Sequence, residues 1–225
     1  TIDYGPYGWL EDYDPDWTPN TTDAEGKRYR FKNQPEVAMW NLVQLGNALY
    51  PLIEDIAAMQ KVLQSCSEQF DRKFSIQQQL KLGLHSEYES DFQDELITLL
   101  TTSETDMTLF YRTLSNVLKK DTPAEALDKV ATAFYTPNKI AGVLKNSWLA
   151  WMESYLTKIN LEVQNDAERK TAMNAINPKY VLRNYMAQLA IEAAEKSDYS
   201  VIDELYTLLK NPYNEQPQYE KWFAK

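Results

Sequence analysis

From residue 35 to residue 225, apolar residues recur at spacings of three and four, which is the period of one face of an α-helix. The first such series is Leu42, Leu45, Leu49, Leu52 and Ile56. The same period continues through residues 56–82, 88–101, 106–118 and 138–162. No stretch alternates apolar and polar residues for long enough to predict a β-sheet. The sequence therefore predicts an all-α body.

Capping residues predict where several helices begin. Thr122-Pro123-Ala124-Glu125 is a capping box with Pro at the first helical position. Its apolar face would consist of Leu127, Val130 and Phe134. Asn177-Pro178 predicts a second helix start. The apolar face of that helix would consist of Leu182, Tyr185, Leu189 and Ala193.

Prolines mark further boundaries. Pro35 suits a first helical position, whereas Pro51 lacks the amide that a helix interior needs and should kink or split its helix. Residues 200–203 predict another start, and Lys210-Asn211-Pro212 ends that helix.

The rarest residue types exclude several classes of enzyme. The chain has six Gly and neither G-x-G-x-x-G nor G-x-x-x-x-G-K-[ST], so no glycine-rich phosphate loop is predicted. The single Cys, Cys66, excludes an internal disulfide and zinc sites with several Cys. The single His, His85, excludes zinc sites with two His, and a Ser-His-Asp or Cys-His catalytic group would have to use it.

Three further features have structural explanations that we favour over catalytic ones. We predict that Cys66 packs on a helix as a small apolar side chain and that His85 caps a helix end or faces solvent. The series Trp148, Trp151 and Tyr155 has helical spacing and indicates core packing rather than ligand stacking.

Acidic residues concentrate at the amino-terminal end. The formal charge is −10, and residues 1–26 hold seven carboxylates and no Lys or Arg. A basic run of Lys27, Arg28, Arg30 and Lys32 follows directly, and we interpret it as pairing with these carboxylates within one loop. The acidic balance argues against nucleic-acid binding. No run of about 18 apolar residues predicts a membrane span.

The first 34 residues differ in kind from the rest. They contain Pro6, Pro15, Pro19 and three of the six Gly, which favour turns and extended chain. We therefore predict an acidic, aromatic loop over residues 1–34 and one helical domain over residues 35–225. No fixed-period repeat indicates a solenoid.

The loop opens with Asp3-Tyr4-Gly5. A carboxylate beside a Gly that permits a sharp turn is what a nucleotide site uses to hold Mg²⁺ against phosphate oxygens. Asp14 and Asp16 could add oxygen ligands, although turn formation is the commoner use of Asp-Pro-Asp.

Several motifs together resemble the selenoprotein O family. At the amino-terminal end these are residues 3–8 (DYGPYG), 13–20 (YDPDWTPN), 33–35 (NQP) and 40–42 (WNL). Near the other end they are residues 177–185 (NPKYVLRNY), 211–213 (NPY) and 215–217 (EQP). The resemblance implies a protein-kinase-like C-lobe with a helical carboxyl-terminal extension, in which residues 1–34 correspond to the activation segment.

The resemblance also implies an activity. Members of this family of pseudokinases transfer AMP from ATP to Ser, Thr or Tyr hydroxyls of protein substrates, with the nucleotide inverted relative to kinases. Asp3 would match the kinase D-F-G aspartate and would bind Mg²⁺ or Mn²⁺ on the nucleotide phosphates. A cytoplasmic location is the expectation for a bacterial member.

The family's other catalytic groups precede the D-Y-G motif, so no catalytic residue is assigned within these 225 residues. We expect the chain to be the carboxyl-terminal part of a larger enzyme. Without the upstream N-lobe and catalytic loop it would neither bind ATP tightly nor transfer AMP. Two alternatives stay open, namely a stand-alone helical interaction module and a fragment of a true phosphotransferase.

Overall fold

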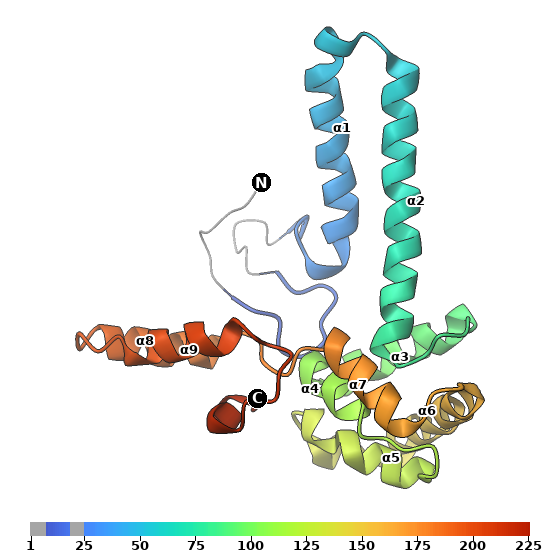
Figure 1. The fold of residues 1–225 in the computed structure, drawn as a ribbon, viewed down its shortest axis with the longest axis vertical. Coiled ribbons are helices and arrows are strands. Elements are labelled where there is room, and N and C mark those ends of the chain that lie inside the picture. Colours follow the sequence, from blue (N-terminus) through green and yellow to red (C-terminus); the bar gives the residue numbers. More distant parts are fainter. Residues whose placement is uncertain (1–7, 19–24) are drawn as a thin grey trace. The chain divides into compact units, whose positions relative to one another are not determined.

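The computed structural model describes residues 8–18 and 25–225, and all its regular structure in these ranges is helical (Figure 1). The α-helices are α1 (Gln34–Ile53), α2 (Ile56–Lys81), α3 (Ser90–Thr102), α4 (Met107–Leu114), α5 (Pro123–Val130), α6 (Gly142–Leu161), α7 (Asp166–Ile176), α8 (Asn184–Ala194) and α9 (Ser200–Leu209). The predicted all-α class is confirmed. None of these helices is long and apolar enough to cross a membrane.

The described residues form two compact units. The first comprises residues 14–18 and 25–78, and the second comprises residues 8–13 and 79–225. The boundary therefore falls within the last turn of α2.

The first unit is built on α1 and α2, which run side by side in opposite directions (Figure 1). Pro35 stands in the first turn of α1, as predicted. The predicted break at Pro51 occurs slightly later, because α1 continues to Ile53 and ends at Glu54, which adopts the left-handed conformation with φ of 53°. Val37 is the single buried residue among the described residues of this unit.

The loop before α1 is held by the charges that the sequence places there. Asp16 pairs with Arg30 at 3.1 Å and with Lys32 at 2.8 Å. The Asp14 carboxylate accepts the backbone amide of Asp16 at 2.8 Å, which makes a tight turn. Both findings agree with the predicted roles of ion pairing and turn formation.

The core of the second unit surrounds one face of α6. Trp148, Trp151 and Tyr155 are buried, as predicted, and Trp151 stacks on Phe92 and on Tyr155 with ring centroids 5.0 and 5.4 Å apart. Their polar atoms are satisfied, because the Trp148 indole donates to the Ser103 hydroxyl at 2.8 Å and the Tyr155 hydroxyl to a backbone carbonyl at 2.9 Å. These rings therefore serve packing.

Local capping signals decide two helix starts in this unit. The Thr122 capping box is formed at α5, with Leu127 and Val130 buried behind it. A second box, made by Asn165 and Glu168, begins α7. Sequence reasoning overlooked α7, although Asn165 and Glu168 carry the spacing of a cap.

The predicted helix start at Asn177-Pro178 is wrong, because α8 begins at Asn184. The preceding residues are extended, since the amides of Lys179 and Tyr180 both donate to the Pro212 carbonyl, at 2.8 and 3.1 Å. These two long-range hydrogen bonds replace the helical turn that Asn177-Pro178 would otherwise begin. The apolar face of α8 is consequently different from the predicted one: Leu189 is 44% exposed.

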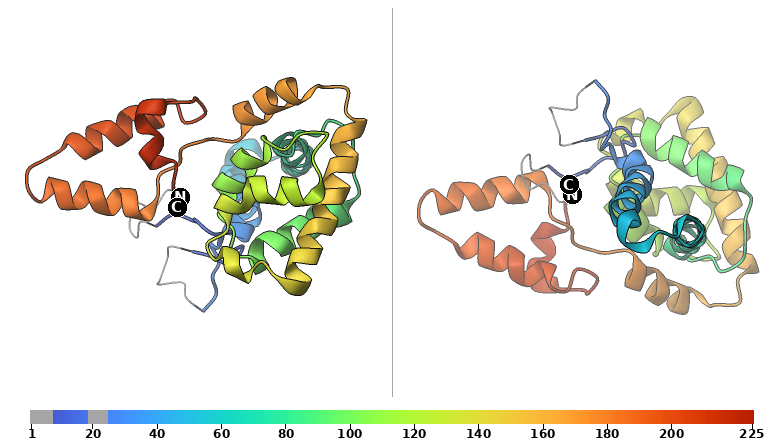
Figure 2. Two further views of the ribbon diagram at one scale, coloured as in Figure 1. Left: turned by 90° about the horizontal axis from the view of Figure 1, so that it is seen from below. Right: turned by 90° about the horizontal axis from the view of Figure 1, so that it is seen from above.

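α8 and α9 lie side by side and bury a second, smaller cluster (Figure 2). Its buried members are Tyr180, Met186, Leu205, Leu208 and Trp222. The predicted start of α9 at Ser200 and its end before residues 210–212 are confirmed.

Candidate functional site

Asp3, the residue that the sequence assigns to nucleotide and metal binding, lies outside the described residues. The described chain begins at Gly8, so the candidate site that can be built is the attachment of residues 8–13, which are separated from the D-Y-G motif by two residues in sequence. All its contacts lie within the second unit.

Asn184 binds the backbone of Trp9 in the way a neighbouring strand would. The Trp9 amide donates to Asn184 Oδ1 at 3.1 Å, and Asn184 Nδ2 donates to the Trp9 carbonyl at 3.0 Å. The backbone amide of Asn184, the first residue of α8, donates to the Glu11 carboxylate at 2.8 Å. A carboxylate at a helix N-terminus is favoured by the helix dipole. Asn184 thus makes three hydrogen bonds to the segment, two to the Trp9 backbone and one to the Glu11 side chain.

A few residues further on, three extended pieces of chain lie next to one another. Asp12 forms an antiparallel bridge with Asp106, and the Tyr13 amide donates to the Thr105 carbonyl at 2.8 Å. Thr105 in turn bridges Phe134. The segment after D-Y-G is therefore paired to backbone that belongs to the core.

A buried ion pair lies beneath this pairing. Asp106 is 0% exposed, caps α4 by accepting the Leu109 amide at 2.8 Å, and receives both terminal nitrogens of Arg183. The Tyr135 hydroxyl donates to the same carboxylate at 3.3 Å. The carboxylate is consequently surrounded by donors from three separate segments of the chain.

The electrostatics keep the Arg183 guanidinium charged. Burial alone lowers the pKa of Arg183, but the hydrogen bonds and the charge of Asp106 outweigh it, so the pKa of the guanidinium is raised. Burial, followed by the nearby Asp106 charge, raises the pKa of Tyr135. Tyr135 therefore stays protonated and acts as a donor rather than as a base.

The neighbouring residues of the same motif, residues 177–185, fasten other parts of the unit. Asn177 Nδ2 donates to the Lys81 carbonyl at 2.8 Å, and the Tyr180 hydroxyl to the Gln216 carbonyl at 3.1 Å. Lys179 pairs with both Glu215 and Glu220 at 2.6 Å. In this chain most polar side chains of the motif therefore make intramolecular contacts, whereas the buried Tyr185 hydroxyl has no hydrogen-bond partner among the described residues.

Sequence reasoning did not assign roles to Asp106, Arg112 or Asn184. Arg112 is buried, donates to the carbonyls of Asn174 and Asn177 at 3.0 and 2.9 Å, and pairs with Glu215 at 2.7 Å. The partners are 62 to 103 positions away in sequence, so no local pattern marks them.

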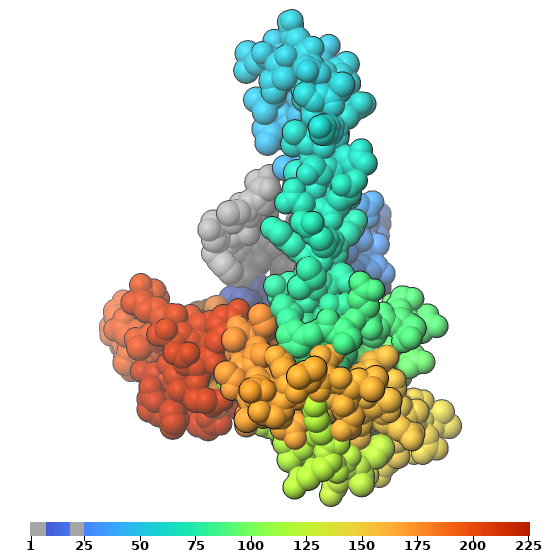
Figure 3. All heavy atoms as spheres, turned by 45° about the vertical axis from the view of Figure 1, so that its right-hand side comes forward, coloured from blue at the N-terminus to red at the C-terminus, as the bar shows by residue number. Residues whose placement is uncertain are grey.

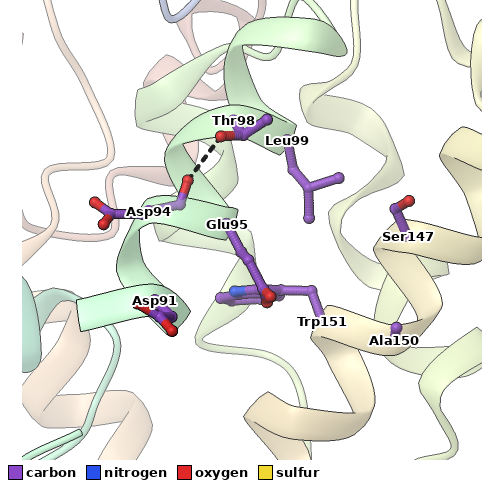
Figure 4. Close-up of a pocket in the computed structure, with 8 residues that line it drawn as sticks. All are labelled: Asp91, Asp94, Glu95, Thr98, Leu99, Ser147, Ala150 and Trp151. Carbon is purple, nitrogen blue, oxygen red and sulfur yellow. Dashed lines mark hydrogen bonds between the residues drawn. The ribbon is translucent and has the colours of Figure 1, made fainter. Parts of the chain in front are cut away.

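A cavity of about 590 Å³ lies between α3 and α6 (Figure 4). Asp91, Asp94 and Glu95 of α3 line one side, and Ser147 and Trp151 of α6 line the other. Its lining contains no Lys or Arg to receive phosphate, and it contains none of the residues predicted for the site. We therefore do not assign the nucleotide to this cavity.

The remaining candidates agree with their structural interpretations. Cys66 is a free, half-buried thiol on α2, and His85 is exposed just after that helix, with its ring 3.2 Å from the Gln164 side chain. In residues 8–18 and 25–225, no group of three or more His, Cys, Asp or Glu is placed to hold a metal ion. The contacts described above hold residues 9–13 against the rest of the second unit.

Comparison with known proteins places the chain in a family. A family model described as "Protein adenylyltransferase SelO" matches residues 1–210. A "Protein nucleotidyltransferase YdiU" of Flavobacterium johnsoniae is 54% identical over 227 residues. Proteins of the same name from Rhodopirellula baltica and Aromatoleum aromaticum are 45% and 43% identical.

These three relatives are longer than this chain. Each match covers 100% of the chain but only 43% or 44% of the relative. The chain therefore spans less than half the length of the curated relatives it matches. On the evidence of its motifs, the family match over residues 1–210 and these identities, the chain belongs to the selenoprotein O family.

Proposed function

We propose that this chain is the carboxyl-terminal part of a protein adenylyltransferase, which transfers AMP from ATP to Ser, Thr or Tyr hydroxyls of protein substrates. The family is described as a protein adenylyltransferase, and the relatives are named as protein nucleotidyltransferases, which supports the proposal. The proposal includes a cytoplasmic location. It includes no nucleic-acid partner, in keeping with the net charge of −10.

The observation that best supports the proposal is the attachment of residues 8–13. Catalysis by positioning requires that a ligand-bearing loop be held by rigid elements. Asn184 holds Trp9, six positions after Asp3, and Asp106, which pairs with Arg183, forms a bridge with Asp12. They would limit the positions open to the D-Y-G motif in the complete enzyme.

Asp3 is the proposed ligand for Mg²⁺ or Mn²⁺. A bound divalent ion would offset negative charge on the attacked phosphoryl group and on the pyrophosphate leaving group. The described residues supply no metal cluster of their own, so Asp3 would act together with groups from the rest of the enzyme. The helical body would correspond to a kinase-like C-lobe and its extension.

The chain by itself is proposed to be inactive. It carries none of the family's other catalytic groups, and it covers 44% of the Flavobacterium johnsoniae relative. Tight ATP binding and AMP transfer would both need the remaining part, because the phosphate-binding groups must act together.

A chimaera tests the proposal. The matched region of the Flavobacterium johnsoniae relative is replaced by this chain, and transfer of label from [α-³²P]ATP to protein is measured for the parent, for Asp3→Ala and for Asp14→Ala as the control. We expect Asp3→Ala to lower transfer at least about 100-fold and Asp14→Ala to leave it within about 3-fold. Equal transfer by the parent and by Asp3→Ala would remove the assigned role.

The same chimaera separates AMP transfer from phosphate transfer. Label from the α-phosphate, together with an adenylyl adduct in the intact mass of the modified protein, would support the proposal. Label from the γ-phosphate alone would identify a phosphotransferase instead.

A further inference from the structure

α1 has the composition of a helix that is buried on all sides. Among its 20 residues Glu36 is the only charged one. Its apolar residues cover most of the circumference of the helix, although Asn41, Gln44 and Asn47 share one side. These apolar residues are Val37, Met39, Trp40, Leu42, Val43, Leu45, Leu49, Tyr50, Leu52 and Ile53. A helix with apolar residues over most of its circumference belongs in a protein core.

The structure nevertheless leaves α1 largely uncovered. Trp40 is 49% exposed, Leu45 is 55% exposed and Leu52 is 82% exposed. Only Val37 of this helix is buried. In proteins, most of the stability of a helix comes from the packing of its apolar side chains rather than from its own backbone hydrogen bonds. The exposed apolar residues of α1 therefore lack the packing that such a helix normally has.

α2 does not complete the packing. It leaves apolar side chains of its own uncovered, among them Ile56, Val62 and Phe74, and Figure 3 shows side chains of α2 at the surface along the helix. Between the two helices lies a groove of about 370 Å³, lined by Val43, Tyr50, Ile56, Met59 and Leu63 among others. The first unit therefore presents many exposed apolar side chains and a largely apolar groove.

The surface does not suit a membrane or a charged partner. The described helices include none that could span a membrane, and α1 offers no cation for anionic lipids. An apolar protein surface is the chemistry that matches it. More than half of the length of the family relatives lies outside the match with this chain, which makes that part the natural source of such a surface.

We infer that α1 is a core helix of the complete family enzyme and that its exposed apolar face docks the part of the family polypeptide outside this chain. The inference rests on family membership and on the exposure of α1, and it does not depend on which group the enzyme transfers. The apolar groove between α1 and α2 would receive side chains of that part.

Amide hydrogen exchange tests the inference. It is measured in this chain and in the full-length Flavobacterium johnsoniae relative, for the peptide that covers residues 34–53 and its aligned peptide. We expect exchange at least about 10-fold slower in the full-length protein, because burial on several sides suppresses local opening. Equal exchange rates would show that the rest of the relative adds no cover to the helix, which would overturn the inference.

Charge substitutions give a matched comparison. Leu52→Glu lies near the carboxyl-terminal end of α1, and Leu161→Glu lies at the end of α6, also 20 residues long, where Leu161 is 78% exposed. Both changes are made in this chain and at the aligned positions of the relative. We expect neither to lower the Tm of this chain by more than about 2 °C, and only the Leu52 change to lower the Tm of the relative, by at least about 4 °C.

A second copy of the chain is the competing occupant. Exchange in the relative is therefore measured at two protein concentrations that span its monomer and any dimer. Protection of the α1 peptide that persists in the monomer supports the inference, and protection that disappears on dilution assigns the face to self-association and overturns it. Neither readout uses AMP transfer, so failure here is distinct from failure of the proposed activity.

Discussion

Arg183 and Asp106, 77 positions apart in sequence, form an ion pair in which the side chains are only 4% and 0% exposed. The carboxylate also caps α4, and Arg183 directly precedes α8. The pair therefore joins the start of α4 to the start of α8, beside the backbone that pairs with residues 12 and 13. Loss of either charge would leave the other buried without a partner.

Arg183→Ala should destabilise the second unit strongly. Removing one partner of a buried pair costs about 3–5 kcal/mol of unfolding free energy. Urea unfolding followed by tryptophan fluorescence measures the cost. Lys139→Ala is the control, because Lys139 pairs with Glu104 at 3.3 Å on the surface and should cost less than about 1 kcal/mol. Similar costs for the two variants would contradict the role given to Arg183.

Asn184→Ala should release the segment after D-Y-G without unfolding the unit. The variant loses both side-chain hydrogen bonds to the Trp9 backbone, a loss of about 1–2 kcal/mol. Exchange of the Trp9 amide should become about 10-fold faster, whereas amides of α9 should not change. Gln188→Ala on the same helix, whose side chain bonds only to Glu192 nearby, should leave the Trp9 amide as it is. An unchanged Trp9 amide in Asn184→Ala would refute the attachment.

The register of α8 and α9 can be tested with leucines. Leu208 is 0% exposed in the second cluster, so Leu208→Ala should cost about 2–5 kcal/mol. Leu189 is 44% exposed, and Leu189→Ala should cost less than about 1 kcal/mol. Chemical denaturation of both variants gives the two values. A reversed order would mean that α8 is turned the other way.

The free energy of unfolding should depend on the protonation of Glu215 at acid pH. Burial raises the pKa of Glu215, but hydrogen bonds from Lys179 and Arg112 outweigh it, so the folded pKa lies below the ordinary value of 4.5. Its contribution is therefore complete above pH 4.5 and is lost as the pH falls through the lower, folded pKa. Glu215→Gln should cost about 1 kcal/mol at neutral pH.

The difference between wild type and Glu215→Gln should shrink as the pH falls below 4.5, which urea titrations across that range would show. Glu104→Gln, at the exposed pair with Lys139, should show a smaller difference at every pH. A constant difference for Glu215→Gln would mean that the ion pairs with Lys179 and Arg112 contribute no net stability.

Much of the helical framework could be predicted because its causes are local. The Thr122 capping box acts over three residues, and Trp148, Trp151 and Tyr155 share a face through the period of one helix. Asn165 gave an equally local signal that was overlooked. Local patterns of this kind do not depend on what the rest of the chain does.

The start of α8 and the attachment of residues 8–13 could not be predicted in the same way. A Pro after Asn177 favours a helix start, but the Pro212 carbonyl, 33 residues beyond Lys179, takes the amides of residues 179 and 180 instead. The Asn184 side chain binds the backbone of Trp9, which is 175 positions away in the sequence. Such pairs form only after distant segments have been brought together, at a cost in loop entropy that no short motif encodes.

The amino-acid sequence by itself determined the helical class, most helix boundaries, the aromatic core of α6 and, through its motifs, membership of the family. The tertiary structure alone decided that the motif of residues 177–185 fastens the chain internally, that Asp106 and Arg183 form a buried pair, and that α1 remains exposed. The physical reason is range: capping and periodicity act within a few residues, whereas ion pairing and burial depend on which distant surfaces meet.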